Sequence, residues 1–157
     1  MRPSGFYWSR MDLCEKRRRL VEDLRSIEDP HERLSVVVDR GRHLPAFPAA
    51  ERVAGNRVPG CVSATYLAKR ASEGRCFFRI DSGSALIKGL AGCFCQLYEG
   101  RGPDEILDDP EGLIAEMGLD RMITPNRLVG IGEVRKAMRR FAQSMRSSVG
   151  QKEEDGG

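Results

Sequence analysis

The amino-acid sequence predicts an α+β domain with a small antiparallel sheet. Apolar residues recur at helical spacing before residue 43 and again in the last third of the chain. Between these parts, residues 62–69 follow a period-two pattern, and a second short run rich in β-forming residues comes after one turn. The order of helix, helix, hairpin and several further helices is typical of this fold class.

Composition sets the broad class of protein. A chain of 157 residues with 40% hydrophobic and 31% charged residues fits one globular domain rather than a disordered chain. The formal net charge of +3 is too small to indicate a nucleic-acid partner. We expect no membrane association, because no apolar run approaches the roughly 20 residues that a spanning helix needs.

The cysteines and the first residues bear on the compartment. The opening stretch MRPSGFYWSR lacks the apolar core of a secretory signal, so we expect a cytoplasmic protein whose thiols stay reduced. Five cysteines without regular spacing argue against a disulfide framework. We expect residues 1–10 to be flexible and the polar tail, residues 148–157, to be disordered.

Two helices are predicted before the hairpin. Residues 12–27 place Leu13, Leu20 and Leu24 on one helical face, and the charged residues 16–19 are expected to face water. Asp29-Pro30 is a typical helix start, and this second helix should end near Arg42, shortly before Pro45. Residues 45–60 then form a long connection, a kind of segment that is often functional.

Turn residues, polar helix caps and hydrophobic periodicity predict the hairpin and the later helices. Residues 72–74 form the turn between the strand at 62–69 and the strand at 76–80. Polar caps at 81–84 open a helix that carries Leu90, Cys93 and Phe94 on one face. Short helical turns are predicted over 103–118, and Thr124-Pro125-Asn126 opens the last long helix.

Cys61 is the cysteine whose position suggests chemistry. It follows Gly60 and precedes a strand, so its thiol is expected at a loop tip, where functional residues gather. A thiolate there can attack a sulfur atom of a second protein, and a structural cysteine in a bend is the alternative. Core packing or no chemical role is expected for the other four: Cys14, Cys76, Cys93 and Cys95.

Other chemistries have weaker support in the sequence. A cysteine hydrolase would need His31 or His43 beside Cys61, and nothing in the sequence brings them together. Cys93 and Cys95 point to different sides of a helix, so a shared metal site is not expected. Basic residues on the last helix are expected to be solvated, with docking of an acidic partner as the alternative: Arg135, Lys136, Arg139, Arg140 and Arg146.

A series of short motifs resembles the SufE family, the sulfur acceptors that partner cysteine desulfurases in iron–sulfur cluster assembly. The series starts with Leu44-Pro45 and the stretch NRVPGCVS at 56–63. It continues with Asp81-Ser82, IKGL at 87–90, Tyr98 and PDEI at 103–106. It closes with Thr124-Pro125-x-Arg127-x-x-Gly130, and the likeness extends from about Leu13 to Ala142.

The resemblance implies a small curved antiparallel sheet packed against helices, within a SufE-like domain over residues 11–147. It implies that Cys61 accepts sulfur as a persulfide, with Gly60, Ser63 and Arg127 in loop or partner contact. The implied partners are a cysteine desulfurase and an iron–sulfur scaffold or downstream acceptor. Pyridoxal phosphate is then expected on the desulfurase, with no cofactor or metal on this chain, which is an accessory carrier rather than a stand-alone enzyme.

Three positions depart from the family pattern. Val62 and Tyr66 stand where the family usually has glutamine and tryptophan, and Gly83 stands where it often has an acidic residue. These departures concern the partner surface. A binding module that regulates a desulfurase or scaffold without carrying sulfur therefore stays open as the second interpretation.

Overall fold

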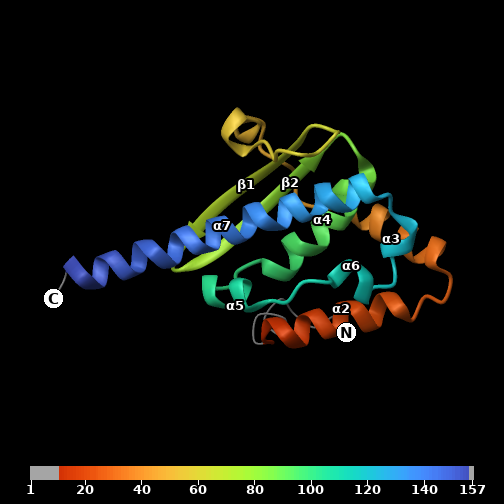
Figure 1. Cartoon of the computed structure of the whole chain (residues 1–157), viewed down its shortest axis with the longest axis horizontal. Helices are drawn as coiled ribbons and strands as arrows, with labels where there is room; N and C mark the ends of the chain where they lie inside the picture. The colour runs from red at the N-terminus through yellow and green to blue at the C-terminus, as the bar shows by residue number, and fades with distance from the viewer. Residues whose placement is uncertain (1–10, 156–157) are drawn as a thin grey trace.

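The computed structural model describes residues 11–155, so the prediction for residues 1–10 lies outside the described residues. In the described part there are six α-helices and one two-stranded antiparallel sheet, which lies along one side of the molecule (Figure 1). The predicted α+β class is therefore confirmed. No helix among residues 11–155 is long and apolar enough to cross a membrane.

The first two helices start where the sequence places them. Helix α2 spans Leu13–Arg25, and the Asp12 carboxylate accepts a hydrogen bond from the Glu15 backbone N–H at 2.8 Å. Helix α3 spans Pro30–Arg42, where Asp29 caps the His31 N–H and Pro30 occupies the first turn.

The hairpin is shorter at its start than the period-two pattern suggests. Strand β1 spans Thr65–Ser72 and pairs with β2, Arg75–Ser82, in a register that joins Thr65 to Ser82. Residues 62–64 lie outside the ladder, which corrects the predicted strand start. The Thr65 hydroxyl contacts the Ser63 carbonyl and the Ser82 hydroxyl, and so fixes the end of the sheet.

Helix α4, Ala85–Tyr98, is the centre of the core and lies between the hairpin, α3 and α7 (Figure 1). The Ser84 hydroxyl caps it by accepting from the Ile87 N–H at 3.3 Å. The backbones of α3 and α4 almost touch, because a Cβ on Gly41 would lie 2.7 Å from the Gly89 Cα. This close packing fixes the start of α4, which later contributes to the site.

Short elements complete the connections. The long connection is not structureless, since it holds the 3₁₀ turns η1, Ala49–Glu51, and η2, Ala54–Asn56. The Arg52 guanidinium also binds the Asp81 carboxylate at 2.7 Å, which ties this connection to the end of β2. Helix α5 spans Pro103–Asp108, α6 spans Leu113–Glu116, and η3 spans Asp120–Met122.

The last helix, α7, spans Pro125–Asp155 and runs along the whole molecule, past the ends of the hairpin strands (Figure 1). It covers α4 and α5 with a buried stripe that includes Ile131, Val134 and Met138. The helix continues into residues 148–155, for which the sequence predicts disorder. The domain boundary at residue 147 stays a prediction.

Two arginines expected in water are buried instead. Arg17 of α2 binds the Asp109 carboxylate at 2.9 Å, and Arg135 of α7 donates to the Asp109 carbonyl oxygen at 2.6 Å. The Tyr98 hydroxyl donates to the same carboxylate at 2.6 Å. We call the group formed by Arg17, Tyr98, Asp109 and Arg135 the buried ion cluster. Periodicity missed it because a long arginine can reach a buried acid from the edge of an apolar stripe.

Candidate functional site

Cys61 lies on a short loop that closes the gap between the long connection and strand β1. The Val58 N–H donates to the Thr65 carbonyl at 2.8 Å, and Val58 itself is buried. Pro59 and Gly60 form a turn, and among the described residues no backbone–backbone hydrogen bond joins residues 59–62 to another element. The loop therefore has a firm base and a tip that only side chains hold.

A bend at Gly60 turns the thiol toward helix α7. Gly60 has φ +84°, a left-handed conformation that favours glycine. A Cβ at this position would also lie 3.2 Å from the Cγ of Glu133. The expected loop role of Gly60 thus has a clear physical reason, although Gly60 does not line the hollow beside the thiol.

The Cys61 thiol rests against the first turns of α7. Its Sγ donates to the Gly130 carbonyl at 3.5 Å. A Cβ on Gly130 would lie 3.3 Å from that sulfur, so glycine leaves room for the thiol against the helix backbone. A Cβ on Gly132, by contrast, would meet nothing within 4 Å.

A hollow of about 200 Å³ lies beside the thiol. The loop, the start of α4 and the start of α7 line it: Cys61, Val62, Ser63, Ser84, Ile87, Thr124, Asn126, Arg127 and Gly130. The structure thus brings together three of the expected site residues, Cys61, Ser63 and Arg127. Arg127 donates to the Ser84 hydroxyl at 3.4 Å, a long contact that leaves its guanidinium largely in solvent.

The surroundings favour the neutral thiol over the thiolate. Burial is the main cause that raises the pKa of Cys61 above its ordinary value of 9.0. The Thr65 hydroxyl lowers this pKa in part, and the negative charge of Glu133 raises it further. In the free protein at neutral pH, the sulfur is therefore mostly protonated and half-buried.

The other cysteines have different surroundings. Cys76, Cys93 and Cys95 are buried, and burial raises the pKa of Cys76 and of Cys93 to about 11 and that of Cys95 further still. Cys14 is exposed on α2. Core packing for Cys93 is confirmed, and the three buried thiols are poor nucleophiles.

The hydrolase alternative gains no support from the structure. Neither His31 nor His43 lines the hollow beside Cys61. The His43 Nδ1 instead lies 2.9 Å from the Asp39 carbonyl of its own helix. Within residues 11–155, no group of three or more His, Cys, Asp or Glu side chains is placed to hold a metal ion.

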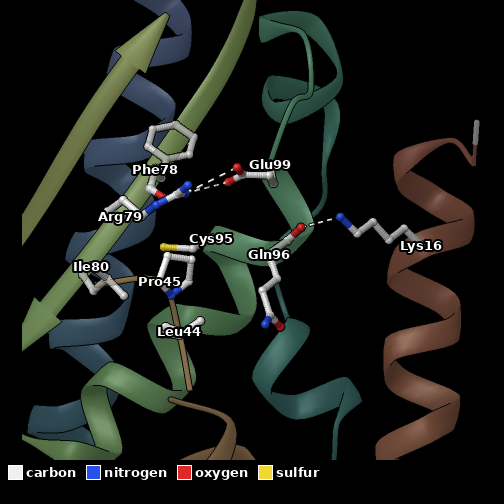
Figure 2. Close-up of a pocket in the computed structure, with 9 residues that line it drawn as sticks. All are labelled: Lys16, Leu44, Pro45, Phe78, Arg79, Ile80, Cys95, Gln96 and Glu99. Carbon is white, nitrogen blue, oxygen red and sulfur yellow. Dashed lines mark hydrogen bonds and ion pairs between the residues drawn. The ribbon is translucent and has the colours of Figure 1, made fainter. Parts of the chain in front are cut away.

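A second hollow of about 350 Å³ lies between β2, α4 and α2 (Figure 2). Leu44, Pro45, Phe78 and Ile80 form its apolar wall, and the Cys95 sulfur points toward them. At its edge, Arg79 pairs with Glu99 at 3.1 Å, and Lys16 donates to the Gln96 carbonyl. Its one thiol, Cys95, is buried, and burial strongly raises its pKa.

Comparison with known families places the site in a context. Residues 18–142 match the family model described as SufE, an Fe-S metabolism associated domain. The chain belongs to the SufE family. The match spans the thiol loop, the hairpin and the start of α7, so every residue lining the Cys61 hollow lies inside it.

Curated relatives include SufE proteins and larger plant enzymes. An uncharacterised SufE-like protein of Synechocystis is 30% identical over 120 residues, which cover 76% of each chain. SufE-like protein 2 of Arabidopsis thaliana is 29% identical over 67% of this chain and 41% of its own length. Rice chloroplastic quinolinate synthase is 37% identical over 64% of this chain, which corresponds to 14% of that enzyme.

One solved structure has a similar fold. The solution structure of a hypothetical protein from Thermus thermophilus superposes with a TM-score of 0.71. It is 21% identical, and the match covers 84% of this chain and 96% of the other. This likeness concerns the fold alone.

The positions that depart from the family pattern cluster near the thiol. The Val62 side chain is 92% exposed at the loop tip. Tyr66 pairs with Asp81 inside the ladder, and a Cβ on Gly83 would lie 3.9 Å from the Ser63 Cβ.

Sequence reasoning missed Glu133, because only the fold reveals that an acidic residue of α7 lies under the Gly60 bend.

Proposed function

We propose that this SufE-family chain accepts sulfur on Cys61 from a cysteine desulfurase, stimulates that enzyme, and passes the sulfur on for iron–sulfur cluster assembly. Membership of a family associated with Fe-S metabolism gives the broad role. The observation that carries the finer proposal is the Cys61 loop, which holds a thiol at the edge of a hollow lined by Ser63, Asn126 and Arg127.

The transfer step needs only a thiolate on this chain. The Cys61 thiolate attacks the outer sulfur of a persulfide on the desulfurase and forms a new S–S bond. The S–S bond of the desulfurase persulfide breaks, and its cysteine leaves as a thiolate. Cys61 then carries the persulfide. Pyridoxal phosphate belongs to the desulfurase, where it releases sulfur from cysteine.

The Cys61 sulfur is half-buried against the Gly130 carbonyl, so an outward movement of the loop would present it fully to a partner. No backbone–backbone hydrogen bond joins residues 59–62 to another element among the described residues, so this movement breaks few interactions. After transfer, the hollow of about 200 Å³ beside the thiol can hold the added sulfur away from small thiols and oxidants.

Mass spectrometry tests the proposal directly. After incubation with a desulfurase, pyridoxal phosphate and cysteine, the peptide that contains Cys61 should gain one sulfur, about 32 Da, by the exchange chemistry above. Cys14→Ser is the matched control, because it removes an exposed thiol elsewhere and should leave the adduct unchanged. An adduct spread equally over Cys14 and Cys61, or none, would contradict the proposal.

A regulatory binding module is the second candidate. The observation in its favour is that the loop tip presents the apolar Val62 to solvent while the thiol points inward. Cys61→Ser separates the two functions. If this variant still stimulates a desulfurase as strongly as the wild type does, docking alone is the function. Loss of stimulation together with loss of the adduct supports sulfur acceptance.

A further inference from the structure

Glu133 is an acidic residue of α7 that lies under the thiol loop. It follows Gly130 by three residues, so both lie on the same side of the helix. Gly130 contacts the Cys61 sulfur. A Cβ on Gly60, the residue before the thiol, would lie 3.2 Å from the Glu133 Cγ and 3.9 Å from its carboxyl carbon. The Glu133 side chain is only 21% exposed. Its carboxylate therefore lies close to the thiol in a partly desolvated place.

Other charges at this end of the molecule offset the effect of Glu133 on the thiol only in part. They come from four elements: Arg127 and Lys136 of α7, Lys88 of α4, Asp81 of β2 and Arg52 of the connection. Asp81 lies between Arg52 and Lys88, at 2.7 and 3.9 Å, so these three form their own group. Lys136 lies 3.1 Å from Glu133, but its side chain is 64% exposed and well hydrated.

We propose that Glu133 adds to burial in holding Cys61 in the neutral thiol form in the free protein, so that the sulfur acceptor is protected from oxidants and small electrophiles between encounters with its partner. The need for protection rests on the proposed function, whereas the electrostatic effect does not. Glu133 acts through Cys61 and is a positioning residue rather than a catalytic one.

Coulomb repulsion is the physical basis. Loss of the thiol proton would place a second negative charge beside the Glu133 carboxylate, in surroundings that screen charge less than water does. The same effect keeps the thiolate that does form strongly nucleophilic, because nucleophilicity rises with thiol pKa. Glu133 thus makes the thiolate rarer but more reactive toward a persulfide that a partner places in contact.

The test is the pH profile of Cys61 alkylation by iodoacetamide, followed on the Cys61 peptide by mass spectrometry in the full chain without a desulfurase. In Glu133→Gln, which keeps the shape of the side chain, the midpoint should move to lower pH, because a negative charge beside the thiol is removed. Lys136→Gln removes the cation beside Glu133 and should move the midpoint upward. Exposed Cys14 is the internal control and should not change.

Added salt separates charge from packing. Raising the ionic strength should lower the Cys61 midpoint in the wild type and have little effect in Glu133→Gln. An unchanged midpoint in Glu133→Gln, or equal downward changes in both variants, would overturn the inference. If the proposed function alone is wrong, the midpoints behave as expected while no sulfur adduct forms on wild-type Cys61.

Discussion

The buried ion cluster and the Cys61 loop differ in how many hydrogen bonds their polar groups make. In the cluster, Asp109 has 2% of its side chain exposed and receives hydrogen bonds from Arg17 and Tyr98. In the loop, the Cys61 thiol donates one long hydrogen bond to the Gly130 carbonyl, and among the described residues no backbone–backbone hydrogen bond joins residues 59–62 to another element. The cluster joins α2, α4 and α7 into one body, whereas the loop can detach without disturbing it.

This difference indicates which residues stabilise the fold and which residues govern the reactivity of Cys61. A fully satisfied buried network is rigid, and removing one member leaves a charge that nothing solvates. A loop with few internal bonds opens at small free-energy cost. Substitutions in the cluster should therefore change the free energy of unfolding, and substitutions in the loop should change the reactivity of Cys61.

Asp109→Ala should have the largest effect. It removes the buried carboxylate that both the Arg17 and the Arg135 guanidinium groups approach and that accepts from the Tyr98 hydroxyl. Arg17 keeps the half-exposed Glu116 as a partner, so the free energy of unfolding should fall by about 2–4 kcal/mol. Denaturant unfolding measures this. Glu111→Ala is the matched control, because Glu111 is 93% exposed beside the same arginine and should change stability by less than about 1 kcal/mol.

A marginal change in Asp109→Ala would contradict the contrast between the two regions. It would mean that water or local rearrangement solvates the two guanidinium groups after the substitution. The free energy of the cluster would then be similar to that of surface ion pairs, and the helices would depend on their apolar contacts alone.

Gly60→Ala changes the Cys61 loop and should have an intermediate effect on the free energy of unfolding. Alanine at φ +84° costs roughly 1–2 kcal/mol, and its Cβ would press on the Glu133 Cγ at 3.2 Å. Because the loop tip has few bonds, it should relieve this strain by moving. We expect a loss of stability below about 2 kcal/mol, together with faster alkylation of Cys61 as the thiol leaves its contact with α7.

Gly74→Ala controls for the conformational term. Gly74 has φ +74° in the hairpin turn, with nothing within 4 Å of an added Cβ. It should cost similar stability without changing the alkylation rate of Cys61. Equal effects of both variants on that rate would show that the thiol responds to general loosening rather than to the Gly60 bend.

The sequence alone predicts much of the fold, because its signals are local. Asp12, Asp29 and Ser84 cap helices at the expected places, and Glu73-Gly74 forms the hairpin turn. The buried arginines could not be predicted, since the partner of Arg17 lies 92 residues further along the chain. Local periodicity carries no information about such a contact.

The candidate site likewise contains residues that local patterns predict and residues that only tertiary contacts reveal. Cys61 and Gly60 stand out because a thiol after a glycine bend is a local pattern, and the SufE resemblance added Arg127. Glu133 and the thiol contact of Gly130 depend on how α7 crosses the loop, at a separation of 69 residues for the hydrogen bond. The spacing of residues in the sequence does not reveal that crossing.

Gly130→Ala should have the smallest effect on stability. It tests whether the Cys61 loop can move while the helices stay in place. The added Cβ would lie 3.3 Å from the Cys61 sulfur, so either the loop or the helix must move. Alanine gains up to about 1 kcal/mol over glycine inside a helix, which should offset most of the packing strain. We expect the unfolding free energy to stay within about 1 kcal/mol, while the thiol moves outward and reacts several-fold faster with iodoacetamide.

Gly132→Ala is the matched variant two residues along the same helix. Its Cβ would meet nothing within 4 Å, so it should stabilise the protein slightly and leave Cys61 unchanged. If Gly130→Ala destabilises the chain strongly without exposing the thiol, the loop is as firmly held as the core. The thiol would then need more than the opening of a loosely bound tip to reach a partner.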